Sequence, residues 1–377
     1  MHPLLILLFS FLQWFTGATS PGGPQQAELL FVGDAMQHQA QLDEALRLGG
    51  GKRYDYSDCF TLIAPEVIKA DYAVVNLEVP LGGGPRYSGY PCFSAPDSYA
   101  EALQDAGFDL FLTANNHCLD RGDAGVRRTV KTLTSMGVDH TGTWHDAADR
   151  AATPPLVRNI NGIKVGFANY TYGTNGIAPK AGAEIALIDK KAMTREVTAL
   201  RKAGAEIVCV CIHWGVEYQL TEHASQRETA QYLADLGVDL IIGSHPHVIQ
   251  PMKVMHNVKT GKDVLVVYSL GNFISNMKTG PTRGGALVKV RLTRAKDGTV
   301  TWSAPVYDTF YSSKPCAELR NYQVIPSWLS DLIPPAQRGW WNTFNNSAER
   351  IFSLHNVGVP RMEAPNVGTH PDASETR

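Results

Sequence analysis

The chain contains six apolar runs of strand length, and each run ends in a group of polar residues. Short apolar runs bounded in this way are typical of buried β-strands. The six runs, with the polar residues that end them, are "ELLFVGDAMQH" with Asp34, "DYAVVNLE" with Asn76 and Glu78, "DLFLTANNHCLD" with Asn115, Asn116, His117 and Asp120, "IVCVCIHWGVE" with His213 and Glu217, "DLIIGSHPH" with His245 and His247, and "DVLVVYSLGN" with Asn272.

Segments with helical periodicity lie between several of these runs, at residues 123–136, 191–203 and 222–236. Apolar strands that alternate with helices predict a layered α/β domain whose strands are covered on both faces. In such sheets, ligands bind beyond the carboxyl ends of the strands. We therefore expect the six polar groups to converge at one edge of the sheet and to form a site there.

Composition narrows the function classes. With 377 residues, 44% of them hydrophobic, the chain can bury one large α/β domain with extensions, or two domains. A formal net charge of -2 with 19% charged residues leaves no basic stripe, which argues against nucleic acid as a partner. The six cysteines form no CxxC pair, which argues against a thiolate zinc site and a dithiol redox enzyme.

The N-terminal segment "MHPLLILLFSFLQWFTGATSPGG" has an apolar stretch of about a dozen positions followed by small residues. That length matches the apolar region of a signal peptide and is shorter than the roughly 20 residues that span a bilayer. We predict a signal peptide at residues 1–20, cleaved near Ala18 to Ser20, and export to the periplasm or cell envelope. An uncleaved N-terminal anchor is the alternative, because the segment contains no Lys or Arg before its apolar stretch.

The residue types at the strand ends indicate a metal site. The candidate ligands combine carboxylate, amide and imidazole groups without sulfur: Asp34, Glu78, Asn116, His213, His245 and His247. Such a nitrogen and oxygen set suits Zn, Mn or Fe. It offers more ligands than one tetrahedral ion uses, and it fits two divalent ions about 3.5–4 Å apart, an arrangement used for phosphoester hydrolysis. The alternative is a set of scattered strand-end polar residues, which any α/β fold contains.

Seven segments of the chain resemble, in order, the motif series of the CapA family of bacterial capsule or poly-γ-glutamate synthesis proteins, itself similar to calcineurin-like metallophosphoesterases. They are "FVGDAMQH", "AVVNLEVPLGG", "YSGYPCFSAP", "TANNHCLDRG", "CIHWGVEY", "GSHPHVIQP" and "YSLGNFIS", within residues 28–292. The resemblance implies a metallophosphatase-like sandwich of sheets flanked by helices. We place this domain at residues 26–305 and a C-terminal extension with a flexible tail at residues 306–377.

The resemblance also implies roles for individual residues. Asp34 and His247 would bind the first ion, and Glu78 would take the place of a bridging aspartate. Asn116, His213 and His245 would bind the second ion, as the family's motifs imply. His117 would be the acid that protonates the leaving oxygen or stabilises the transition state. Imidazole ligands usually have their second ring nitrogen fixed by an acceptor, for which Asp120 and Glu217 are the candidates.

One position departs from the wider superfamily. Calcineurin-like enzymes typically place a histidine two residues after the first aspartate, and here that position is Met36. His38 is either a substitute ligand or an ordinary loop residue. If His38 does not coordinate, the first ion has fewer ligands and catalysis by two ions is in doubt.

The segment at residues 80–96 is rich in Gly, Pro and aromatic residues, and such loops often carry function. Arg86 and Tyr90 are candidates for contact with an anionic substrate, because a guanidinium suits phosphate or carboxylate. A packed surface loop is the alternative.

Two functions remain. The first is an exported metal-dependent hydrolase, phosphoesterase-like, linked to capsule or poly-γ-glutamate synthesis. The second is a non-hydrolytic metal-binding component of a cell-envelope polymer machine. The expected partners are an anionic polymer or phosphoester substrate and membrane-bound capsule synthesis proteins.

Overall fold

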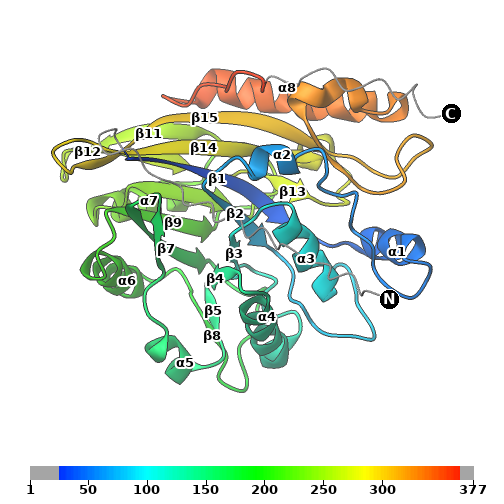
Figure 1. Ribbon diagram of the computed structural model, residues 1–377, viewed down its shortest axis with the longest axis horizontal. Coiled ribbons are helices and arrows are strands. Elements are labelled where there is room, and N and C mark those ends of the chain that lie inside the picture. The colour runs from blue at the N-terminus through cyan, green and yellow to red at the C-terminus, as the bar shows by residue number, and fades with distance from the viewer. Residues whose placement is uncertain (1–24, 366–377) are drawn as a thin grey trace, which may run out of the picture.

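Two β-sheets pack face to face, with helices on their outer faces, in the computed structural model (Figure 1). The structure describes residues 25–365. The predicted signal peptide at residues 1–20 and the last residues of the predicted tail, 366–377, lie outside the described residues. The predicted layered α/β fold class is confirmed.

The first sheet has eight strands. Strand β13 (Asn272–Ile274) pairs with β1, and the other seven follow one another in the order β16 (Val324–Pro326), β15 (Val300–Ser312), β14 (Gly284–Arg294), β1 (Gln25–Ala35), β2 (Tyr72–Leu77), β3 (Leu110–Leu112) and β4 (Asp139–Thr141). Strands β1 to β4 are parallel, so their carboxyl ends lie at one edge.

The second sheet has six strands, in the order β11 (Met252–Asn257), β12 (Lys262–Val267), β10 (Leu240–Ser244), β9 (Ile207–His213), β7 (Ile163–Thr171) and β6 (Val157–Ile160). Its four central strands are parallel and its two edge strands are antiparallel to their neighbours. A separate pair joins β5 (Thr143–Trp144) to β8 (Glu184–Ile185).

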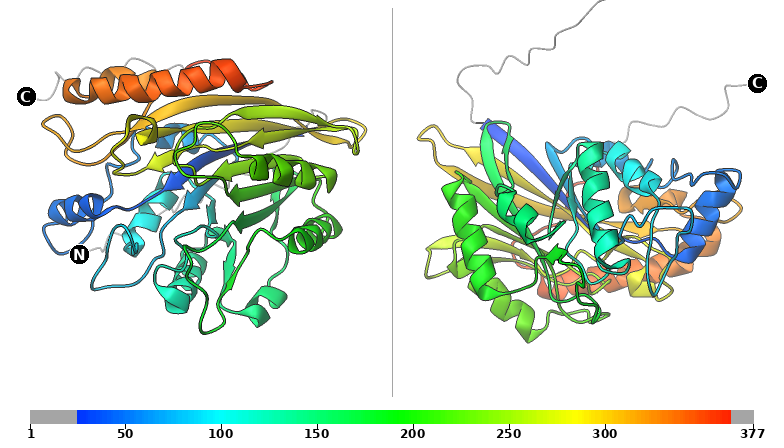
Figure 2. Two further views of the ribbon diagram at one scale, coloured as in Figure 1. Left: turned by 180° about the vertical axis from the view of Figure 1, so that it is seen from behind. Right: turned by 90° about the horizontal axis from the view of Figure 1, so that it is seen from below.

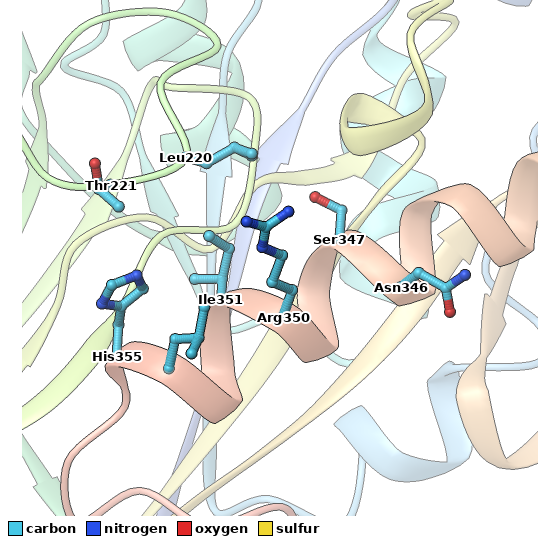
Figure 3. A pocket seen from close by; sticks show the side chains of 8 residues that line it. Leu220, Thr221, Asn346, Ser347, Arg350, Ile351 and His355 are labelled. Atoms are coloured by element: carbon cyan, nitrogen blue, oxygen red, sulfur yellow. The ribbon is translucent and has the colours of Figure 1, made fainter.

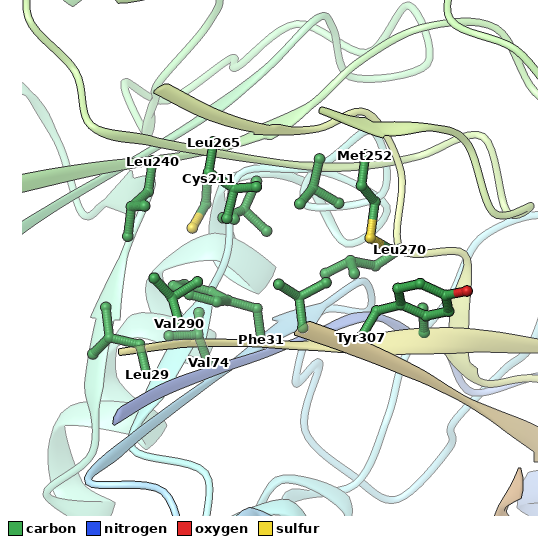
Figure 4. Packing of buried hydrophobic residues seen from close by; sticks show 14 of the residues in the cluster. Leu29, Phe31, Val74, Cys211, Leu240, Met252, Leu265, Leu270, Val290 and Tyr307 are labelled. Carbon is green, nitrogen blue, oxygen red and sulfur yellow. The ribbon is translucent and has the colours of Figure 1, made fainter. Parts of the chain in front are cut away.

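Alternation along the strands builds the layers, because successive side chains of a strand point to opposite faces. In β1, Leu29 and Phe31 belong to the core between the two sheets, whereas Leu30 packs on the helices outside the first sheet. In β9, Cys209 and Cys211 face the central core, as two residues on one face of a strand should. Figure 4 shows residues of both sheets meeting in this central core.

The helices complete the outer layers (Figure 2). They are α1 (Gln39–Leu48), α2 (Ala64–Val67), α3 (Asp97–Asp105), α4 (Gly122–Met136), α5 (Ala147–Ala152), α6 (Lys190–Lys202), α7 (Ala224–Asp235) and α8 (Arg338–His355), with short 3₁₀ turns η1 (Gly280–Thr282), η2 (Ser327–Leu332) and η3 (Pro335–Gln337). The three helices predicted from periodicity correspond to α4, α6 and α7, with ends that differ by at most two residues. None of the helices in residues 25–365 is both long and apolar enough to cross a membrane.

The C-terminal part is joined to the domain more closely than the sequence indicated. Strand β15 continues past residue 305, so the predicted boundary falls inside a strand. Helix α8 has 18 residues and contacts both β15 and β11, one strand from each sheet (Figure 1). Trp341 is buried, whereas Trp340 is 47% exposed.

Candidate metal centre

The carboxyl ends of parallel strands from both sheets meet at one place and bring the predicted polar residues together. In the first sheet, Asp34 lies in register with Asn76 of β2 and with Asn272 of β13. In the second sheet, His213 lies in register with Ser244 of β10. The predicted convergence follows from this topology, because parallel strands end at the same edge of their sheet.

Asp34, Glu78 and His213 form the centre of the site. One ligand atom from each of these residues lies within 4.8 Å of the other two, and all three side chains are fully buried. His213 Nε2 lies 3.5 Å from Glu78 Oε1. Two carboxylates and an imidazole at this spacing are the donors that a divalent cation of the Zn, Mn or Fe type prefers.

Several buried atoms at this place have no hydrogen-bond partner. They are both carboxylate oxygens of Glu78, Oδ1 of Asn76 and Nδ1 of His245. Buried polar atoms are almost always paired, and a buried carboxylate without a donor or a cation is strongly unfavourable. The unpaired atoms are mainly lone-pair donors grouped around one point. The residues present therefore fit a bound cation.

His245 and His247 complete the imidazole set. The His245 ring lies 4.7 Å from the His213 ring, measured between centroids. His247 Nδ1 lies 3.2 Å from Asp34 Oδ2, and its Nε2 lies 3.7 Å from Glu78 Oε1. Both residues have positive φ, 102° and 58°, which is uncommon for residues other than glycine and is typical of strain held at functional sites.

Burial controls the charge of the central groups. Burial, and then the neighbouring Asp34 carboxylate, raises the pKa of Glu78 well above its usual value. Burial, followed by the neighbouring imidazoles, lowers the pKa of His213 well below its usual value and lowers the pKa of His245 to about 3. Both imidazoles are therefore neutral at physiological pH, which is the form that binds a metal ion.

Asn116 and His117 come from the loop after β3. Asn116 Oδ1 lies 2.8 Å from His213 Nε2, so its carbonyl oxygen faces the cluster. His117 Nδ1 lies 2.8 Å from Asp120 Oδ2, which also accepts a hydrogen bond from the backbone N–H of Phe93. Asp120 thus orients the imidazole of the candidate acid, whereas it was predicted to orient an imidazole that binds metal.

Glu217, the second residue predicted to orient an imidazole, lies away from the histidines' ring nitrogens. Its side chain is exposed, and among residues 25–365 it forms no hydrogen bond with an imidazole. The chain leaves β9 through a loop in which Tyr218 has a positive φ of 66°. Ser244 contacts His213 Nδ1 instead, at 3.1 Å, and Asn272 Oδ1 lies 3.0 Å from His247 Nδ1.

Met36 and His38 both lie close to the site but outside the central cluster. Met36 is 1% exposed and packs in the core beneath the first sheet. The Nδ1 atom of His38 accepts a hydrogen bond from the backbone N–H of Asn276 at 3.3 Å and lies 3.3 Å from Gln41 Oε1. Burial lowers the pKa of His38 to about 4. His38 therefore begins α1 as a loop residue in this conformation.

Three exposed tyrosines surround the histidines. Tyr90 lies 6.5 Å from the His117 ring, Tyr172 lies 4.5 Å from the His245 ring and Tyr218 lies 6.3 Å from the His247 ring, all between centroids. Of the two predicted substrate contacts, Tyr90 is thus next to the site. Arg86 is exposed, and no hydrogen bond or ion pair within residues 25–365 joins it to the site.

Three further residues contact the site, and no role was predicted for them from the sequence. Asn76 donates to Asp34 Oδ1 at 2.7 Å, and Asn175 accepts a hydrogen bond from Asn116 at 3.2 Å. Tyr172 and Asn175 follow β7, whose run "VGFANYTYGTN" also ends in polar residues. That signal was present as a seventh strand end.

A surface groove lies elsewhere, between the loop at Leu220 and Thr221 and the side of α8 that faces this loop (Figure 3). Its volume is about 550 Å³, and Arg350 and Ile351 are among the residues that line it. None of the candidate metal ligands contributes to it. The groove and the metal cluster are thus separate features.

Relatives with curated names support a common family. The chain is 28% identical to the capsule biosynthesis protein CapA of Bacillus anthracis, over 77% of this chain and 71% of that protein. It is 27% identical to the PGA biosynthesis protein CapA of Bacillus subtilis (strain 168), over 78% of this chain and 76% of that protein.

Among solved structures, the calcineurin-like phosphoesterase YfkN of Bacillus subtilis is similar, with 12% identity and a TM-score of 0.43, covering 87% of this chain and 99% of that chain. The family described as bacterial capsule synthesis protein PGA_cap matches residues 28–277, which is most of the described chain. All seven motifs that resemble this family lie within the matched residues. The chain belongs to the bacterial capsule synthesis protein family PGA_cap.

Proposed function

We propose that the protein is an exported, metal-dependent hydrolase that cleaves phosphoesters or a related bond in an anionic cell-envelope polymer. The observation that carries this proposal is the fully buried Glu78 carboxylate, which has no hydrogen-bond donor and lies beside Asp34 and His213. The names of the two relatives, which refer to capsule and PGA biosynthesis, support a place beside membrane-bound polymer synthesis proteins.

Each side chain has a distinct task in this proposal. Asp34, Glu78 and His213 would hold divalent cations, together with Asn116, His245 and His247. Bound divalent ions of this kind polarise a phosphoryl oxygen and lower the pKa of a coordinated water. Hydrogen bonds from Asn76 to Asp34 and between Ser244 and His213 orient these ligands before any ion binds.

His117 is the candidate acid. Because Asp120 engages its Nδ1 atom, Nε2 is the ring nitrogen left to face a substrate. From that atom a protonated imidazole can donate to the leaving oxygen, a contribution of about 10²–10⁴-fold in rate. The ring packs edge-on against Phe93, with centroids 4.6 Å apart, which keeps it in place.

The test uses the purified chain after chelation and reloading with Mn, Zn or Fe. Reloaded protein should hydrolyse a chromogenic phosphomonoester or phosphodiester, and His245→Ala and Asn116→Ala should abolish the activity. His256→Ala is the matched control, because His256 is exposed on β11 and pairs with Asp263. Hydrolysis that persists in both site variants would contradict the proposal.

Met36 supports the second candidate function, metal-dependent binding of an anionic chain without hydrolysis. Its side chain lies in the core, where the wider superfamily has a histidine ligand, so the first ion would have fewer ligands. Elemental analysis separates the two candidates. Two ions per chain with turnover favour the hydrolase, whereas bound metal with no turnover of either ester favours the binding component.

A further inference from the structure

Arg283 is a buried cation that pairs with no carboxylate of residues 25–365. The residue directly follows η1 in the chain and is 3% exposed. The guanidinium donates through Nη2 to Tyr311 Oη at 2.9 Å, and its Nε has no hydrogen-bond partner. The buried Lys289 shows the usual arrangement, since its ammonium contacts Glu28 at 2.5 Å and Glu66 at 2.7 Å. Buried charges are normally paired in this way.

Two further cations lie near Arg283. Tyr311 Oη, which accepts from Arg283, and the backbone N–H of Lys314 both donate to Gln337 Oε1, at 3.4 Å and 3.0 Å. Lys278 lies in the loop that leads into η1. In agreement with this placement, burial, followed by Arg283 and Lys278, lowers the pKa of Lys314 to about 8. Within residues 25–365, no carboxylate forms an ion pair with any of these three residues. Cations brought together without an anion repel one another, and an anion bound between them would remove this repulsion.

The cluster flanks the metal centre. Asn272, whose Oδ1 contacts His247, donates through Nδ2 to the backbone carbonyl of Thr282 at 3.0 Å, and Thr282 directly precedes Arg283. The same loop joins His38 to the end of β15, because Asn276 donates its backbone N–H to His38 Nδ1 at 3.3 Å and Ser275 exchanges hydrogen bonds with Ser312. The loop at residues 275–282 therefore contacts both the surroundings of the metal centre and those of the cations.

Aromatic rings hold the guanidinium in place. Its central carbon lies 5.3 Å from the centroid of Tyr311 and 5.6 Å from that of Trp340. Such contacts position a cation, but they leave its N–H donors free for an anion. Trp340 is 47% exposed, so the cluster lies next to solvent. The cluster joins residues that flank β14 and β15 to the C-terminal extension. The metal centre uses none of these segments.

We propose that Arg283, Lys314 and Lys278 form an oxyanion-binding site, for a phosphate or carboxylate group, that is distinct from the metal ligands and holds an anionic part of the substrate. A planar guanidinium binds such groups through two parallel hydrogen bonds, and a flanking ammonium adds charge. Only the statement that the anion belongs to the substrate rests on the proposed function. The binding itself does not.

The test measures anion binding to chelator-treated, metal-free full-length protein by titration calorimetry. The probes are inorganic phosphate and glutarate, at constant ionic strength because salt screens exposed charges. Arg283→Gln and Lys314→Gln should each weaken binding about tenfold or more, as expected for a lost charged hydrogen bond. Lys296→Gln, an exposed cation in the turn between β14 and β15, is the matched control and should bind like the wild type.

The outcomes are distinct from those of the hydrolase test, because no metal and no turnover are involved. Tighter binding of phosphate assigns the site to a phosphoryl group, and tighter binding of glutarate assigns it to a carboxylate. The proposal is overturned if the wild type binds neither anion at millimolar concentration, or if both variants bind like the wild type. If Arg283→Gln fails to fold, the partly buried Lys314 decides the result alone.

Discussion

Glu78 shows how one residue connects stability with ligand binding. Its carboxylate is fully buried beside Asp34, and burial together with that second acid raises its pKa. An uncompensated carboxylate at this position opposes folding, because its charged form loses hydration and gains no donor. A bound cation reverses the balance, since a ligand that binds only the native state stabilises it.

Glu78→Gln should therefore uncouple stability from metal. The wild type should gain about 2.7 kcal/mol in free energy of unfolding at Mn²⁺ concentrations 100 times the Kd. The variant should lose this gain, and without metal it should unfold at a urea midpoint equal to or above that of the wild type. Glu217→Gln, an exposed change of the same type, should respond to Mn²⁺ like the wild type. An undiminished response in Glu78→Gln would contradict the assignment of Glu78 as a ligand.

Sequence alone identified much of the site, because each ligand follows an apolar run that ends at the same edge. Asp34, His213 and His245 are found in this way, without distances. Apart from the two residues that follow β7, whose apolar run was a readable signal, the residues that were not found have contacts rather than motifs as their signal. Nothing in the local pattern shows that Asn76 bonds to Asp34, or that Arg283 lacks a carboxylate, because both facts depend on chain segments far apart in sequence.

At the scale of elements, one carboxylate of α4 holds the loop between β7 and α6 in place. Asp123, in the first turn of α4, accepts hydrogen bonds from the backbone N–H groups of Lys180, Ala181 and Ala183 at 2.8–2.9 Å. The same loop carries Asn175, which contacts Asn116 and His117. Periodicity predicted α4 itself, but this connection joins residues almost 60 positions apart.

Asp123→Asn should destabilise the protein by roughly 1–3 kcal/mol, because backbone donors lose their charged acceptor. The three N–H groups lower the pKa of Asp123 to about 2, from an ordinary value of 3.8. This contribution is therefore complete above the unfolded value and is lost as the pH falls from 3.8 toward 2. Urea unfolding at pH 6 and at stepwise lower pH checks both statements.

Asp105→Asn is the matched control, because Asp105 is exposed at the end of α3. It should change the free energy of unfolding by less than about 0.5 kcal/mol at neutral pH. If Asp123→Asn behaves like this control, the carboxylate does not anchor the loop. The loop's position would then depend on Ala183 and Ile185, which pack with Leu119 and Val126.

At the scale of the whole molecule, the C-terminal extension closes the sandwich. Its residues join the central core, and the chain after α8 forms isolated bridges to both sheets, at Lys253 and at Tyr307. No strand-to-cluster pattern is visible in the sequence of the extension, because its strand β16 has only three residues and the chain after it pairs through isolated bridges and packs through an amphipathic helix. The family match, by contrast, ends at residue 277, before the extension.

Two positions on α8, one buried and one exposed, test whether this extension is part of the folding unit. Ile351 is 5% exposed and packs in the central core, whereas Leu354, one turn further on, is 63% exposed. Ile351→Ala should lower the free energy of unfolding by about 2–5 kcal/mol, since it leaves a cavity between the sheets and α8. Leu354→Ala should stay within about 0.5 kcal/mol of the wild type.

Denaturant unfolding followed by fluorescence and circular dichroism should show one coincident transition in both variants. A separate early transition for Ile351→Ala would mean that α8 unfolds on its own, and the Trp340 ring that packs on Arg283 of the cation cluster would then be lost with it.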